Sequence, residues 1–96
     1  MREKEVETYL RDRVKALGGK AYKFVSPGNA GVPDRVVCLP GGHVLFVELK
    51  APGKKPTPLQ NAEQLKMSKM GCLVFNLDSK AQVNHFIEYC QSAMLT

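Results

Sequence analysis

The spacing of apolar residues in the first part of the chain predicts a helix followed by a strand. Across residues 3–17 apolar positions recur at about every fourth residue, as on the buried face of a helix, and Gly18-Gly19 ends the pattern. Residues 20–25 then alternate, with Tyr22 and Phe24 on one side and Lys23 on the other. A helix and a first strand are therefore expected before a loop that begins at Ser26.

Two apolar runs in the middle of the chain predict a β-hairpin. Residues 35–39 and 43–47 are rich in β-forming residues, and Pro40-Gly41-Gly42 separates them. Folding the hairpin about Gly41 places position 34 opposite position 48. Because side chains alternate along a strand and directly paired residues share a face, Asp34, Glu48 and Lys50 are expected to cluster at the open end. A slip of one residue would break this cluster.

The stretch after the hairpin predicts a well-capped helix. Thr57 is a favourable N-cap, Pro58 suits the first helical position, and Gln60 completes a capping box with Thr57. The helix is expected to continue to Met70, where Gly71 stops it.

The end of the chain predicts one more strand and one more helix. Residues 72–77 form an apolar run of strand length, and Asp78 or Ser79 then caps a final helix. The order α-β-β-β-α-β-α predicts a single α/β domain over residues 1–96, in which helices flank a four-stranded mixed sheet.

The expected cluster of two carboxylates and a lysine has a specific chemical use. Adjacent carboxylates repel and resist desolvation, and a divalent cation would remove that cost. Mg²⁺ binds one or two carboxylates with several waters and accepts phosphate oxygens in its other positions. Lys50 could then orient an attacking water or neutralise charge on a phosphate. The cluster favours phosphodiester hydrolysis, and the alternative is a surface salt bridge between strand-end charges.

The charge of the chain is compatible with a polyanionic partner. Fourteen Lys and Arg against nine Asp and Glu give a net charge of +5, although such an excess can also serve solubility alone. Lys23, Lys54 and Lys55 are candidates for phosphate contacts, and each is also explained as a solvated surface lysine.

The cysteines indicate a reducing compartment. Cys38, Cys72 and Cys90 are odd in number, lie in apolar patterns and lack the spacing of a metal site, so they are expected to be buried thiols. The sequence has no signal peptide and no apolar run long enough to span a membrane, so we expect a cytoplasmic protein, in the host cell if a phage encodes it.

The ordered motifs resemble those of a nuclease family. Gly31-Val-Pro-Asp34, thirteen intervening residues and Glu48-Leu-Lys50 resemble the PD-(D/E)XK signature. With Glu7 in the first helix and Pro58-Leu-Gln60 after the hairpin, the set more narrowly resembles the virus-type replication-repair nucleases, the VRR-NUC family. The resemblance covers nearly the whole chain and implies a restriction-endonuclease-like core.

The resemblance also implies roles for individual residues. It makes Asp34, Glu48 and the Leu49 carbonyl ligands of Mg²⁺ or Mn²⁺, with Glu7 supporting a metal directly or through water. Lys50 would position or activate the nucleophilic water, and Gln60 would help to place it. Glu7 is otherwise an ordinary helix residue that could pair with Arg11, and Gln60 is otherwise only a helix cap.

The function implied is metal-dependent, structure-selective cleavage of DNA. Free-standing members of the family resemble homodimeric resolvases of four-way (Holliday) junctions, and a two-fold dimer presents two active sites to a two-fold junction. The alternatives are a flap or nonspecific DNA nuclease, an RNA nuclease, or a basic DNA-binding module whose acidic cluster is structural. None of these involves a membrane.

Overall fold

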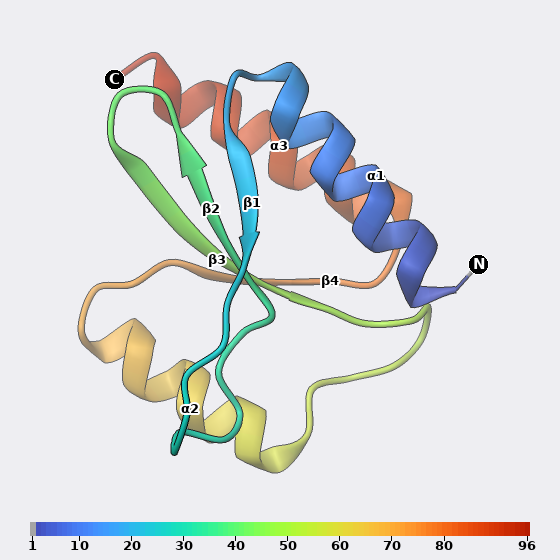
Figure 1. Ribbon diagram of the computed structural model, residues 1–96, viewed down its shortest axis with the longest axis vertical. Coiled ribbons are helices and arrows are strands. Elements are labelled where there is room, and N and C mark those ends of the chain that lie inside the picture. Colours follow the sequence, from blue (N-terminus) through green and yellow to red (C-terminus); the bar gives the residue numbers. More distant parts are fainter. Residues whose placement is uncertain (1) are drawn as a thin grey trace.

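A computed structural model describes residues 2–96, which form helices on both sides of one sheet (Figure 1). The predicted order α-β-β-β-α-β-α is confirmed. In chain order the elements are α1 (Glu3–Ala16), β1 (Lys20–Lys23), β2 (Arg35–Leu39), β3 (His43–Leu49), α2 (Pro58–Lys69), β4 (Val74–Leu77) and α3 (Lys80–Met94).

The sheet is four-stranded and mixed, as predicted. Its strands lie in the order β1-β2-β3-β4, with antiparallel pairs β1–β2 and β2–β3 and a parallel pair β3–β4. In the hairpin, Leu39 pairs with His43 and Arg35 pairs with Val47. Continued by one residue, this register places Asp34 opposite Glu48, so the register predicted by folding about Gly41 is confirmed. Gly41 has a φ of 90°, which glycine adopts without a steric penalty.

One face of the sheet packs against α1 and α3 to form the main core. Figure 1 shows these two helices together on one side of the sheet and α2 on the other. Val37 and Val47 point toward α1 and α3 and are fully buried. The helices contribute buried residues at helical spacing: Val6, Leu10, Val14, Val83, Phe86, Ile87 and Cys90. Burying each large apolar side chain stabilises the fold by about 1.5–3 kcal/mol, so this face holds most of the apolar stabilisation.

The opposite face, beneath α2, has a thinner apolar layer. Only Gln64 and Met67 of α2 are buried, and one of these is polar. Phe24 and Phe46 pack with ring centroids 5.5 Å apart. Helix α2 is therefore positioned in part by polar contacts, which also shape the site described below.

Two strand boundaries differ from the sequence prediction for identifiable reasons. The first strand ends at Lys23, although the Phe24 N–H still donates to the Asp34 carbonyl at 2.7 Å. The fourth strand begins at Val74, because the Cys72 N–H donates to the Met67 carbonyl and so belongs to the exit turn of α2. The caps at Thr57 and Ser79 lie within the predicted choices.

The three cysteines are free, but only one of them is buried. Cys90 lies in the main core, where burial raises the pKa of its thiol to about 11. Cys38 and Cys72 are half-buried. The prediction of buried thiols is thus right for Cys90 and wrong for the other two, which lie on the thinner α2 side of the fold. Across residues 2–96, no helix has the length and apolar character needed to cross a membrane.

Candidate active site

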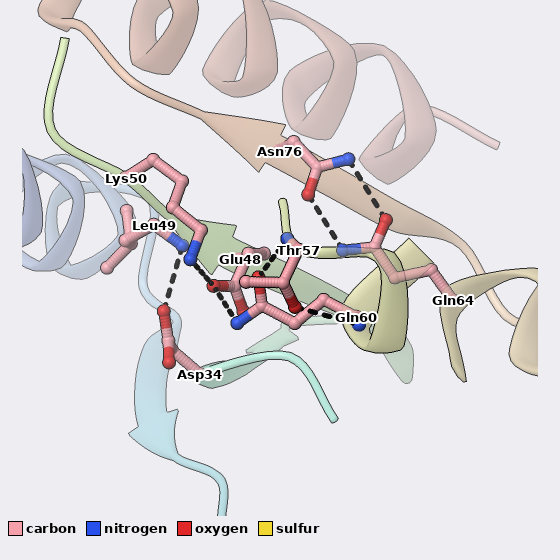
Figure 2. A network of polar contacts seen from close by, with 8 residues as sticks. All are labelled: Asp34, Glu48, Leu49, Lys50, Thr57, Gln60, Gln64 and Asn76. Atoms are coloured by element: carbon pink, nitrogen blue, oxygen red, sulfur yellow. Dashed lines mark hydrogen bonds and ion pairs between the residues drawn. The ribbon is translucent and has the colours of Figure 1, made fainter. Parts of the chain in front are cut away.

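The hairpin brings Asp34, Glu48 and Lys50 together at its open end, as the register predicted. Figure 2 shows these three residues near one another, beside the start of α2. The Leu49 N–H donates to Asp34 Oδ2 at 3.0 Å, and Lys50 Nζ lies 3.1 Å from Glu48 Oε2. Pro33, directly before Asp34, is fully buried and fixes the approach of the chain to this point.

Glu48 is a buried carboxylate with unequal oxygens. Its side chain is 1% exposed. Oε2 accepts hydrogen bonds from Lys50 and from Gln60 Nε2, at 3.1 and 3.0 Å. Within residues 2–96, Oε1 is the buried side-chain polar atom left without a hydrogen-bond partner. A buried acceptor without a donor lowers the stability of the folded protein by about 1–3 kcal/mol. Oε1 therefore lacks a partner that another group would have to supply.

The protonation of Glu48 reflects the same environment. Burial is the largest effect and raises the pKa of its carboxyl above the ordinary value. The hydrogen bond from Lys50 opposes this shift, whereas the negative charge of Asp34 adds to it. The charge of Asp34 therefore destabilises the charged form of Glu48, and a cation between the two carboxylates would reverse that effect.

Gln60 joins the start of α2 to the carboxylate. Its Oε1 accepts from the Thr57 N–H at 2.9 Å, and its own N–H donates to Thr57 Oγ1 at 3.2 Å. These two bonds are the predicted capping box. The other end of the same amide donates to Glu48 (Figure 2). The cap therefore holds Gln60 in the orientation that reaches the site.

The loop before Asp34 lies against the same helix start. Gly31 has a φ of 91°, and a Cβ there would lie 2.9 Å from the Leu59 carbonyl oxygen. A side chain would thus be both strained and in collision with backbone. This glycine lets the loop pack against α2 just before the chain enters β2 through Asp34.

A reciprocal amide pair was not anticipated from the sequence. Gln64 Nε2 donates to Asn76 Oδ1 at 2.8 Å, and Asn76 Nδ2 donates to Gln64 Oε1 at 3.0 Å. Asn76 on β4 is the register partner of Glu48, and Gln64 lies one helical turn after Gln60. The pair therefore fixes α2 over the strands that carry the site. The available signals were an Asn within an apolar strand and a second Gln four residues after Gln60.

Glu7 lies apart from the other predicted site residues. Its Oε1 is 2.6 Å from Arg35 Nη2, so its partner is Arg35 and not Arg11. Arg35 follows Asp34 and pairs with Val47, which places it on the α1–α3 face, opposite Asp34 and Glu48. Residues 2–96 contain no group of three or more His, Cys, Asp or Glu side chains placed to hold a metal. Metal support by Glu7 stays a prediction.

The predicted phosphate-contacting lysines divide into two locations. Lys54 and Lys55 are exposed and line a cavity of about 50 Å³ together with Lys50. They therefore lie on the side of the candidate site. Lys23 pairs with Arg35 across the sheet and lines a different groove, beside α1.

Comparisons with known proteins agree with these features. No family model matches the chain. The protein named "Putative nuclease p44", from Acyrthosiphon pisum secondary endosymbiont phage 1, is 52% identical over 80 residues, which cover 83% of this chain and 86% of that relative. A solved structure described as a VRR_NUC domain is 40% identical, with a TM-score of 0.84, and the match covers 90% of this chain and 94% of that one. Together with the fold and the Asp34, Glu48 and Lys50 arrangement, this relationship shows that the chain belongs to the VRR-NUC family of nucleases.

Proposed function

We propose that this nuclease is a divalent-metal-dependent endonuclease that cleaves branched DNA, with four-way junctions as its preferred substrate and a homodimer as its active form. The observation that carries the chemistry is the buried, unpartnered Oε1 of Glu48 beside Asp34. Lys50 and Gln60 already occupy the other oxygen of Glu48, so the free oxygen marks where a further group would bind.

The donor set fits a hard divalent cation. Asp34 and Glu48 would supply carboxylate oxygens, and the Leu49 carbonyl would be a further ligand, which agrees with the preference of Mg²⁺ and Mn²⁺ for oxygen. When bound, such an ion lowers the pKa of a bound water and withdraws charge from a phosphate. Two carboxylates suffice, because waters and substrate phosphate oxygens complete the coordination of Mg²⁺.

The remaining side chains have roles that follow from their positions. Lys50 is the cation nearest to Glu48, and its ammonium can orient the attacking water or stabilise charge that develops on the phosphate. Gln60 donates to Glu48 Oε2 through its amide and so holds the carboxylate while Oε1 has no partner. Lys54 and Lys55, on the same side, would bind phosphates next to the cleaved one.

The branched substrate and the dimer rest on symmetry and on size. Paired cuts across a two-fold junction need two active sites related by a two-fold axis, which a homodimer supplies. A chain of 96 residues buries only roughly 60–65% of the surface that its unfolded chain exposes, less than a larger domain, so association would also add stability.

The test is a cleavage assay on labelled four-way junction, flap and linear duplex DNA, with Mg²⁺, Mn²⁺ or EDTA, alongside light scattering of the purified protein. We expect paired cuts on the junction that require metal, and the mass of a dimer. Equal cutting of every substrate would retain the chemistry and reject junction selectivity. Binding without cutting in either metal would identify a DNA-binding module instead.

A further inference from the structure

A basic groove lies outside the candidate active site, between α1 and the edge strand β1. It has a volume of about 540 Å³ and is lined by Arg11, Asp12, Lys15, Gly19, Lys20, Ala21, Tyr22, Lys23 and Arg35. The lining thus contains five cationic side chains and one carboxylate. Its cations come from three elements, α1, β1 and β2, which the fold brings to one surface.

Most of these cations are available for a ligand. Arg35 is neutralised by Glu7. Arg11, Lys15, Lys20 and Lys23 are exposed and form no ion pair with any carboxylate in residues 2–96. The Lys20 ammonium lies over the Tyr22 ring, on the other face of β1 from Lys23. The three exposed cations on the α1 side, Arg11, Lys15 and Lys23, repel one another, so binding an anion there would relieve an existing electrostatic cost.

Protection of the sheet edge explains only part of this arrangement. Lysines on an edge strand discourage pairing with another chain, and β1 is an edge of the sheet. That role accounts for Lys20 and Lys23. It does not account for Arg11 and Lys15, which belong to α1 and contribute to the same groove.

The groove begins one residue along the strand from Asp34, on the opposite face of the sheet from the candidate site. Lys23 pairs with Arg35, the residue after Asp34, and the Phe24 N–H donates to the Asp34 carbonyl. From Lys23 the groove follows β1 back to Gly19. At about 3.3 Å per residue, the four residues of β1 extend roughly 10–13 Å, which corresponds to the rise of about three or four base pairs.

We propose that this groove binds the sugar–phosphate backbone of a DNA duplex arm beyond the phosphate that is cleaved. The inference rests on the proposed function and adds a second contact surface to it, on the α1 side of the sheet. Because the contacts are cationic side chains to phosphates, binding there is independent of base sequence and weakens with salt.

The test compares two triple variants with the same loss of charge. The groove variant is Arg11→Gln, Lys15→Gln, Lys23→Gln, because the Lys23 side chain shares the α1 face of the sheet with Arg35. The control is Lys4→Gln, Lys66→Gln, Lys69→Gln, which alters exposed lysines at the start of α1 and in the last turn of α2. Equal melting temperatures would show that both variants fold.

The measurement is the affinity for a labelled four-way junction in EDTA, over a range of KCl concentrations. The slope of log affinity against log salt becomes less steep by about 0.9 for each lost phosphate contact. We therefore expect the slope of the groove variant to be less steep than that of the wild type by roughly 2–3, and the slope of the control to change little. In Mg²⁺, the groove variant should show a raised KM with a kcat near that of the wild type.

The outcomes separate this inference from the proposed function. Equal salt slopes for the two variants, with a wild type that binds and cuts, would overturn the groove and leave the nuclease intact. A wild type that neither binds nor cuts DNA would overturn both. A groove variant with lower kcat and unchanged KM would also reject the proposal, because the groove would then act on the chemistry.

Discussion

At the scale of single residues, Glu48 combines burial with incomplete pairing. One oxygen has two donors, the other has none, and burial with the nearby Asp34 charge raises the pKa of the carboxyl. The metal-free protein therefore holds this carboxylate at a cost to its stability. We expect that cost to be visible as a dependence of stability on pH.

The pH dependence has a definite sign. Because the pKa of Glu48 is higher in the folded state than in the unfolded one, its contribution favours folding below the unfolded pKa. That contribution is lost as the pH rises through the folded-state pKa. In EDTA, the melting temperature of Glu48→Gln relative to the wild type should therefore rise as the pH increases above the ordinary glutamate pKa of 4.5. A difference that stays constant with pH would show that burial of Glu48 has no such effect.

Replacing Lys50 should lower the rate of cleavage much more than the affinity for DNA. Lys50→Ala removes the ammonium next to Glu48 but leaves Lys54, Lys55 and the groove cations in place. We expect cleavage to fall by at least about 10²-fold, the range for losing a group that stabilises transition-state charge, with junction affinity changed only slightly. Single-turnover cleavage and binding in EDTA measure the two quantities. Loss of binding together with cleavage would assign Lys50 a structural role.

At the scale of elements, the start of α2 combines a cap with a contact to the site. Thr57→Ala removes one half of the capping box and keeps the Gln60 amide, whereas Gln60→Ala removes the other half of the box together with the bond to Glu48. Each should destabilise the protein by about 0.5–2 kcal/mol. Turnover should fall clearly only in Gln60→Ala. Equal turnover in the two variants, measured well below their melting temperatures, would reduce Gln60 to a cap.

The sequence predicted most of this element arrangement because its signals are local. The hairpin register follows from two apolar runs around Pro40-Gly41-Gly42, and the α2 cap follows from Thr57 and Gln60. Both depend on residues a few positions apart. These signals also place Asp34, Glu48 and Lys50 together without knowledge of the tertiary fold.

The contacts that the sequence did not predict all join distant parts of the chain. Glu7 and Arg35 are 28 residues apart, and Gln64 and Asn76 meet only after a helix has crossed back to the sheet. No periodicity specifies which polar side chain faces which across two packed elements. The placement of Lys23 in the α1 groove was missed for the same reason, since it depends on where α1 packs.

At the scale of the whole molecule, small size makes stability sensitive to any bound ion. A ligand at roughly 100 times its Kd adds about 2.7 kcal/mol, and for a domain this size each 1 kcal/mol shifts the melting temperature by about 4–8 °C. Mn²⁺ should therefore raise the melting temperature by roughly 10–20 °C in the wild type.

Asp34→Asn is the matched control for this effect. The amide oxygen can still accept from the Leu49 N–H, so the fold should persist while the negative charge is lost. We expect Mn²⁺ to stabilise this variant much less, as followed by thermal melting with and without EDTA. The same shift in both proteins would place the ion away from Asp34.

The turn at Pro40-Gly41-Gly42 has a consequence for how this gene tolerates change. It is exposed and lies at the opposite end of the hairpin from Asp34 and Glu48, yet its length sets which residues of β2 and β3 share a face. Loss of a single codon there would either distort the turn or rotate Glu48 into the apolar core. In a library of in-frame deletions, this distant surface turn should therefore be nearly as intolerant as the candidate active site itself.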